Sequence, residues 1–179
     1  MFRNWCSDDE VTRYLTWPSH ASVDVTHEVL TSWIRGYEDP SFYQWAIVLR
    51  DLGEPIGSIS CVELDEDISS IEAGYCLGKP WWHQGIMTEA FAAVIDFFFD
   101  VIRAHRVCAK HDVHNPRSGF VMEACGLTYE GTLRQAARNN QGIIDICVYA
   151  ILEDEWRHAR AIKDDNGAIH HDERTSHAL

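Results

Sequence analysis

Residues 79–91, KPWWHQGIMTEAF, join a strand-like segment to a helical one through Gln84-Gly85, with an expected helix start at Thr88-Glu89-Ala90. Such a turn can hold a phosphate, because the first N–H groups of a helix have no intrahelical partner and the helix dipole favours an anion there. Phosphate loops are usually rich in glycine, whereas this one has a single Gly85. The same residues fit an ordinary turn capped by Thr88, and the spacing alone does not decide between the two.

A second group of chemically capable side chains, His111, Asp112 and His114, lies near the end of a later apolar run. Histidine and aspartate can bind metals, but strand alternation puts His111 and Asp112 on opposite faces, which argues against a shared ion. The His170-His171 pair lies in a polar tail and fits a solvated segment better than a metal site. We therefore expect no metal site.

The elements that must position these residues alternate between helix and strand patterns. Apolar residues recur at helical spacing over 25–37, and strand patterns cover 43–50, 55–64, 69–77, 106–113, 127–135 and 143–151. Residues 89–102 are apolar on almost every face, which is typical of a helix buried against a sheet. Asn115-Pro116 opens a short helix that ends at Gly126, because Asn favours the N-cap and Pro the first helical position.

This order predicts one α/β domain over residues 1–157, with a mixed, largely antiparallel sheet flanked by helices. Residues 158–179 are polar and fit a disordered tail. The formal net charge of −13 argues against nucleic acid or an anionic membrane as a partner. Six cysteines without C-x-x-C spacing, no visible signal peptide and no membrane-spanning run predict a cytoplasmic protein with reduced thiols.

Three stretches together resemble the GNAT family of N-acetyltransferases, in the branch of the ribosomal-protein N-terminal acetyltransferases RimJ and RimL. EAGYCLGKPWWHQGIMTEA resembles the strand, acetyl-CoA loop and helix start of that branch, HNPRSGFVMEACGL its Asn-x-x-Ser helix, and YEGTLR the next strand. The match keeps one order over roughly residues 4–152. It implies a GNAT-like fold and an enzyme that moves an acetyl group from acetyl-CoA to a primary amine, on a protein N-terminus or a small molecule.

The resemblance also implies where acetyl-CoA binds. Its pantetheine arm would lie in a gap where strand 70–77 splays away from strand 106–113. The implied cofactor contacts are Cys76, Leu77, His83, Gln84, Gly85, Ile86, Met87, Thr88, Asn115 and Ser118. The family usually has Gly or Ala where this chain has His83 and Met87, so the loop is expected to seat the pyrophosphate slightly differently.

For the chemistry, the resemblance implies direct attack by the amine in a ternary complex, with backbone N–H groups near Leu77 polarising the thioester carbonyl. Many GNAT enzymes protonate the departing thiolate with a Tyr four residues after the Ser118 position. Here that residue is Met122, so Ser118 or a water must serve. Cys76 is interpreted as structural, because no His/Asp arrangement that would activate it is assignable.

The general base stays open among several residues. The carboxylate that some relatives place two residues beyond Arg-Gln corresponds to Ala137 here and is absent. Candidates that remain are Glu72, His111, Asp112 and His114. Glu72 fits a solvated strand carboxylate at least as well.

Several aromatic residues are candidates for the acceptor site. Trp81 and Trp82 follow the third strand and fit either an acceptor pocket or the core. The N-terminal region shapes the acceptor site in the resembled family, and there the chain has Trp5, Trp17, Trp33 and Tyr37.

One departure concerns the start of the chain. The branch normally begins with a strand that pairs with the segment 43–50, and no such strand precedes Trp5 here. The start is truncated or misassigned, or another chain covers the bare edge, and a homodimer is one way to do so. The missing strand, Met122 and Ala137 also leave an alternative: an acyl-CoA-binding or regulatory module that has lost catalysis.

Overall fold

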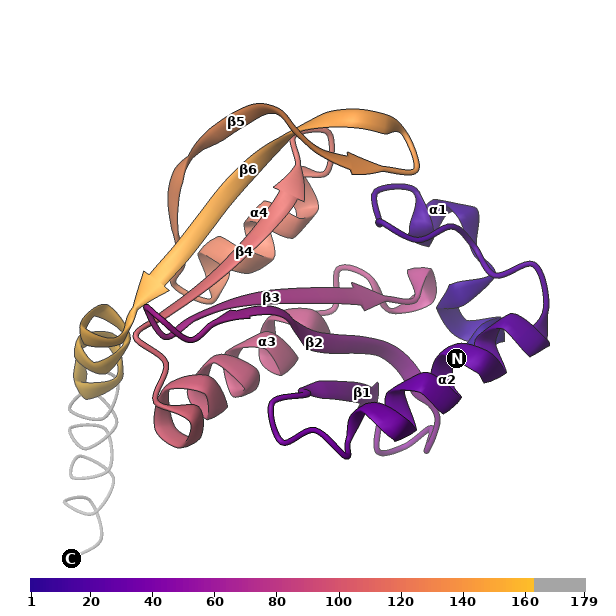
Figure 1. Cartoon of the computed structure of the whole chain (residues 1–179), viewed down its shortest axis with the longest axis horizontal. Helices are drawn as coiled ribbons and strands as arrows, with labels where there is room; N and C mark the ends of the chain where they lie inside the picture. The colour runs from indigo at the N-terminus through magenta and orange to yellow at the C-terminus, as the bar shows by residue number, and fades with distance from the viewer. Residues whose placement is uncertain (163–179) are drawn as a thin grey trace, which may run out of the picture.

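A computed structural model of the chain describes residues 1–162. Its six strands form one sheet in the order β1-β2-β3-β4-β6-β5 (Figure 1). The strands are β1 (Gln44–Val48), β2 (Pro55–Asp65), β3 (Ser70–Leu77), β4 (Arg106–Asp112), β5 (Thr128–Asn139) and β6 (Gly142–Leu152). Only β3 and β4 pair in parallel, and the other four pairs are antiparallel. The mixed, largely antiparallel α/β fold is therefore confirmed.

Four α-helices and three short turns of other helix types complete the labelled elements. The helices are α1 (Asp9–Thr12), α2 (Val23–Gly36), α3 (Ile86–Phe97) and α4 (Pro116–Ala124), and the turns are η1 (Phe2–Cys6), η2 (Lys79–Trp81) and η3 (Phe98–Ile102). Residues 153–162 are also helical, so the expected domain end at residue 157 falls inside a helix. The rest of the expected tail, with His170-His171, lies outside the described residues. Among residues 1–162, no helix has the length and apolarity needed to cross a bilayer.

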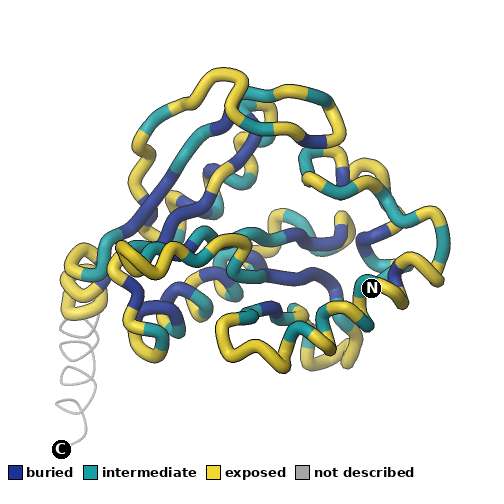
Figure 2. The backbone as a smooth tube through the Cα atoms, viewed as in Figure 1, coloured by how far each residue is buried: buried dark blue, intermediate teal, exposed yellow. Residues whose placement is uncertain are grey.

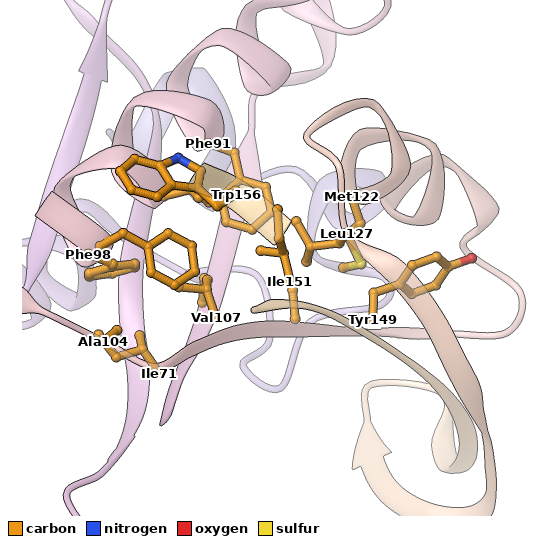
Figure 3. Packing of buried hydrophobic residues seen from close by; sticks show 14 of the residues in the cluster. Ile71, Phe91, Phe98, Ala104, Val107, Met122, Leu127, Tyr149, Ile151 and Trp156 are labelled. Carbon is orange, nitrogen blue, oxygen red and sulfur yellow. The ribbon is translucent and has the colours of Figure 1, made fainter. Parts of the chain in front are cut away.

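The main core lies between the sheet and the helices α3 and α4. Phe91 and Ile95 of α3 belong to one buried cluster with Ile71 of β3 and Val107 of β4, and all four are almost fully buried. Figure 3 shows Phe91, Ile71 and Val107 within this cluster. Figure 2 shows buried residues following the central strands and the helix α3. The apolar run at 89–102 is thus covered by the sheet, as its pattern predicts.

The helix 153–162 extends this core. Trp156 stacks on Phe99 with ring centroids 5.0 Å apart and donates a hydrogen bond from Nε1 to Asp96 Oδ1 at 2.7 Å. An indole buried with its N–H satisfied anchors the helix on η3 and α3.

The strands β3 and β4 separate halfway along their length. Their ladder pairs Ser70 with Arg106 and ends at Ala73 with Ala109, yet β3 continues to Leu77 and β4 to Asp112. Figure 1 shows the two strands diverging beyond this point, with α3 and α4 beginning near the open end. The gap that the family resemblance implies is therefore present.

Two local predictions need correction. The helix after the loop begins at Ile86 rather than at Thr88, because Gly85 adopts φ +77 as its N-cap and Thr88 lies within the first turn. The apolar segment is also not one regular helix: α3 ends at Phe97, and the wider turn η3 follows until Arg103, with φ +64, ends it.

The hairpin of β5 and β6 reaches across the molecule. The strand expected at 127–135 runs from Thr128 to Asn139 with two irregularities in its register, which leaves Asn140-Gln141 as the turn. Asn140 Nδ2 donates to the carbonyl oxygens of Thr12 and Trp17, both at 2.8 Å. The tip of the hairpin is thereby fixed to the N-terminal segment, above the open end of the sheet (Figure 1).

Candidate active site

A cavity of about 700 Å³ opens where β3 and β4 diverge. Its walls are the end of β3 (75–77), the loop and first turn of α3 (81–88), the segment 114–118 with parts of α4, and parts of the N-terminal segment 10–15. All ten residues implied as cofactor contacts line it, from Cys76 to Ser118. Glu72 does not.

The loop before α3 presents free backbone donors to this cavity. The first intrahelical bond of α3 runs from Glu89 N to Gly85 O at 3.0 Å, so the N–H groups of Ile86, Met87 and Thr88 precede it. A Cβ placed on Gly85 would meet nothing within 4 Å, so the space in front of the loop is open. Helix N–H groups facing an open cavity form a site for an anion.

The two unusual loop residues behave differently. Met87 is 7% exposed and packs with Ile56 and Leu77, so its side chain lies in the core while its N–H remains at the helix start. His83 is exposed and has φ +62, a conformation uncommon outside glycine. Gln84 donates from Nε2 to Pro80 O at 2.9 Å, which holds the loop closed on itself.

Trp82 connects the loop to β3 and to α4. Its Nε1 donates to Leu77 O at 2.7 Å, and the guanidinium of Arg117 lies 5.5 Å from its ring centroid. Trp81 packs against Gly78, where any larger side chain would collide with the indole ring. Both tryptophans are half-buried and line the cavity, so each combines the packing and the pocket role considered for it.

The end of β3 directs one backbone donor into the gap. Gly78 N donates to Ile56 O at 2.8 Å, so residues 76 and 78 turn their backbone groups toward β2. Alternate residues of an antiparallel ladder point these groups to opposite sides. The N–H of Leu77 therefore faces the side of β4, where the ladder has already ended.

Cys76 is buried with its thiol 3.4 Å from Ser58 Oγ, in a cluster with Trp5 and Cys6. Burial raises the pKa of the Cys76 thiol, and the hydrogen bonds from Ser58 only partly oppose this. Since the thiolate is the nucleophilic form, this environment suits a structural cysteine.

Asn115 and Ser118 face the cavity from the start of α4. Asn115 holds the N-cap position, but its side chain makes no capping bond; Nδ2 instead donates to Ser118 Oγ at 3.2 Å. The Ser118 hydroxyl accepts this bond and keeps its own proton, for which residues 1–162 provide no hydrogen-bond acceptor. Met122 is 1% exposed in the main core, away from the cavity.

Tyr75 is a site residue that the sequence did not reveal. Its hydroxyl donates to Ser118 O at 3.0 Å and so connects β3 to α4 across the gap. Burial raises the pKa of Tyr75, more than the bond to Ser118 lowers it. In the sequence, Tyr75 looks like any other residue of an alternating strand pattern. That pattern does not indicate that its hydroxyl contacts Ser118.

Glu72 lies apart from these residues. It is paired across the intact part of the β3–β4 ladder with Cys108 and forms an ion pair with Lys110. The Glu72 side chain is 18% exposed. The structure thus brings Ser118 to the cavity and leaves the other predicted catalytic residue outside its walls.

The three residues 111, 112 and 114 separate into two environments. His111 is buried against Tyr149, with ring centroids 5.6 Å apart, and its Nδ1 lies 2.7 Å from the backbone oxygen of Asp112. Asp112 turns the other way, to Asn139 and His114, and His114 lines the cavity. The side chains of His111 and Asp112 thus lie on opposite faces of β4, as strand alternation predicts. Within residues 1–162 no cluster of three possible metal ligands occurs.

The N-terminal wall differs from the expectation. Trp5 is 1% exposed in a core cluster, and Trp17, Trp33 and Tyr37 do not line the cavity. Its lining side chains there include Glu10, Arg13 and Tyr14. Glu10 is ion-paired with Lys79, while Arg13 lies over the Tyr14 ring.

Comparisons with known proteins agree with this geometry. The family model "Acetyltransferase (GNAT) domain" matches residues 1–128. "Putative ribosomal N-acetyltransferase YdaF" of Bacillus subtilis (strain 168) is 31% identical over 137 residues, which cover 76% of this chain and 74% of that protein. "Ribosomal-protein-serine acetyltransferase" of Escherichia coli (strain K12) is 33% identical over 101 residues, 56% of each chain. A crystal structure named as a putative acetyltransferase from T. thermophilus superimposes with a TM-score of 0.74 at 31% identity, over 92% of this chain and 85% of that one.

Proposed function

The chain belongs to the GNAT family and is an acetyl-CoA-dependent N-acetyltransferase, and we propose that it acetylates a primary amine by direct attack within a ternary complex. The divergence of β3 and β4 carries this proposal. It joins two sets of free backbone donors in one cavity, the N–H groups of Ile86–Thr88 and the N–H of Leu77.

Each set of donors suits one part of acetyl-CoA. The start of α3 matches the pyrophosphate, because helix N–H groups and the dipole both favour an anion. Arg117 adds a cation at the same cavity. The pantetheine arm is then directed between the strands toward Asn115 and Ser118.

In the reaction, the neutral amine attacks the thioester carbonyl and forms the C–N bond. The N–H of Leu77 stabilises the developing oxyanion, a role worth roughly 3–4 kcal/mol per donor in other enzymes. The C–S bond then breaks with its electron pair on sulfur, and Ser118 Oγ–H donates the proton that completes CoA–SH. The nitrogen loses a proton to give the amide, and the Ser118 oxygen regains one from water. Ser118 suits this role because its oxygen accepts from Asn115 and its own proton is free of acceptors within residues 1–162.

The acceptor is a protein N-terminus or a small amine. Relatives named for ribosomal proteins favour an amine on a protein, and the N-terminal segment 10–15 supplies a wall of the cavity against which such an acceptor can lie. No observation on residues 1–162 favours the alternative of a binding module without catalysis.

The test is release of CoA thiol from acetyl-CoA across short peptides with free N-termini, polyamines and aminoglycosides. We expect thiol release with an acetylated product, and initial-velocity plots that intersect. Parallel plots with an acetyl-enzyme would overturn direct attack. Tight binding of CoA without turnover of any acceptor would overturn the catalytic proposal.

A further inference from the structure

The reaction needs a group that takes the proton of the attacking amine, and one histidine that lines the cavity is held by a buried carboxylate. We propose that His114 is the general base and that Asp112 is its positioning residue; the inference rests on the proposed function. His114 lines the cavity, and its Nδ1 lies 3.0 Å from Asp112 Oδ1.

Asp112 is built to hold an imidazole. Its side chain is 1% exposed and accepts three hydrogen bonds, from His114 N at 2.9 Å, His114 Nδ1 at 3.0 Å and Asn139 Nδ2 at 2.7 Å. Burial alone would raise the pKa of Asp112, but these bonds outweigh it and hold the pKa below its ordinary value. The carboxylate therefore stays ionised and fixed in place.

This arrangement selects the tautomer of His114. A carboxylate can only accept, so the ring proton of neutral His114 sits on Nδ1 and Nε2 keeps its lone pair. The His114 side chain is 78% exposed while its partner is buried, so the free side of the ring meets solvent and the cavity. Nε2 can take a proton from an amine and return it to water.

The His114–Asp112 pair and Ser118, the expected general acid, lie close together in the sequence, around the start of α4. Asn115 N donates to Asp112 O at 2.7 Å, and the Asn115 side chain donates to Ser118 Oγ at 3.2 Å. The base His114 is thus held by Asp112 and the acid Ser118 by Asn115, and Asp112 and Asn115 are themselves joined by a backbone hydrogen bond. In the reaction the proton lost by the amine nitrogen passes to His114 Nε2 and from there to water. The thiolate receives a different proton from Ser118, and the Ser118 oxygen takes a proton back from water.

The other titratable groups around the cavity are less suited to this role. These groups are Glu10, Arg13, Tyr14, Tyr75, His83 and Arg117, together with the thiol of Cys76. Glu10 is ion-paired with Lys79, the Tyr75 hydroxyl already donates to Ser118 O, and burial raises the pKa of the Cys76 thiol. His83 lies in the loop that faces the phosphates.

The test compares His114→Asn with wild type, using a short peptide with a free N-terminal Ser as acceptor. Asn keeps an N–H donor for Asp112 and removes Nε2. We expect kcat to fall about 10²-fold or more, with unchanged affinity for acetyl-CoA by calorimetry. The acid limb of the kcat–pH profile that belongs to the base should disappear, while any limb from the amine itself remains.

His105→Asn is the matched control, because His105 is an exposed histidine at the other end of β4. Its kcat should stay at the wild-type value. Asp112→Asn separates a positioning role from a folding role. It should lower kcat in the wild-type background and add nothing in the His114→Asn background, since its effect passes through His114.

Equal kcat in His114→Asn and wild type would overturn the inference while leaving the acetyltransferase intact. An Asp112→Asn effect of the same size in both backgrounds would overturn the positioning role. A wild-type enzyme that turns over no amine would overturn the proposed function, and the inference with it.

Discussion

At the scale of single residues, the loop before α3 has one glycine, yet it brings three helix N–H groups to the cavity, as the proposed anion site requires. Gly85 supplies the positive φ that starts the helix, and the three following N–H groups need no particular side chain. Met87, which replaces a small residue of the family, turns its side chain into the core. Both unusual positions line the cavity, but only His83 has an exposed side chain there.

Gly85 offers a sharp test of the anion site. Asn and Asp have almost the same shape, and both tolerate the left-handed conformation better than most residues. Open space in front of Gly85 accepts either side chain. We expect Gly85→Asp to weaken acetyl-CoA binding at least about tenfold relative to Gly85→Asn, because a carboxylate beside a phosphate costs on the order of 1–4 kcal/mol.

Calorimetry on both variants measures this difference. Equal dissociation constants for Gly85→Asn and Gly85→Asp would mean that the pyrophosphate does not lie at this loop. Rising salt should reduce the difference between them, since the effect is electrostatic.

At the scale of elements, the β3–β4 pair divides into a paired half and an open half, and Glu72 belongs to the first. Its ion pair with Lys110 crosses the intact ladder. We expect Glu72→Gln to leave kcat within about threefold of wild type, well short of the 10²-fold or more expected on losing a general base. The free energy of unfolding should fall by about 1 kcal/mol or less, because Lys110 is 35% exposed and the pair is partly screened.

Lys110→Met is the companion variant and should behave in the same way, since it removes the other partner. Turnover and urea unfolding, measured on both variants, distinguish a catalytic role of Glu72 from a structural role of the Glu72–Lys110 ion pair. A large loss of kcat in Glu72→Gln alone would restore Glu72 as the base and count against His114.

Much of this arrangement could be predicted from the sequence. The alternation of strands, the apolar run 89–102 and the Asn115-Pro116 start each depend on local pattern, and the structure has an element at each. The sequence predicts the start of α3 two residues too late, because the conformation of Gly85, not the capping preference of Thr88, decides where the helix begins. The contact of Tyr75 with Ser118 depends on where two distant elements meet, so no local pattern contains it.

At the scale of the whole molecule, β1 is an edge strand, and no other strand among residues 1–162 pairs with its outer side. The ladder of β1 with β2 leaves the backbone groups of Ala46 on the outer side, while Gln44 O accepts from the Tyr37 hydroxyl. An edge strand without charged residues is a site for pairing with another strand. Self-association through β1 stays a prediction. The outward-facing N–H of Ala46 gives a way to test it.

Ala46→Pro removes the outward N–H without removing a bond to β2, whereas Ala46→Val keeps it. If a homodimer forms through β1, Ala46→Pro should dissociate it and Ala46→Val should not. Sedimentation across a concentration series measures this. A dimer that survives Ala46→Pro would have its interface elsewhere.

Several separate elements form the cavity, so a ligand bound there should stabilise the folded state. Its walls come from β3, α3 and α4 and from the N-terminal segment, which the β5–β6 hairpin holds through Asn140. Acetyl-CoA at about 100 times its dissociation constant should stabilise the folded state by about 2.7 kcal/mol. For a chain of this size the melting temperature should then rise by about 5–10 °C. Gly85→Asp at the same ligand concentration should show a clearly smaller shift, whereas an equal shift in both proteins would place the bound cofactor away from the start of α3.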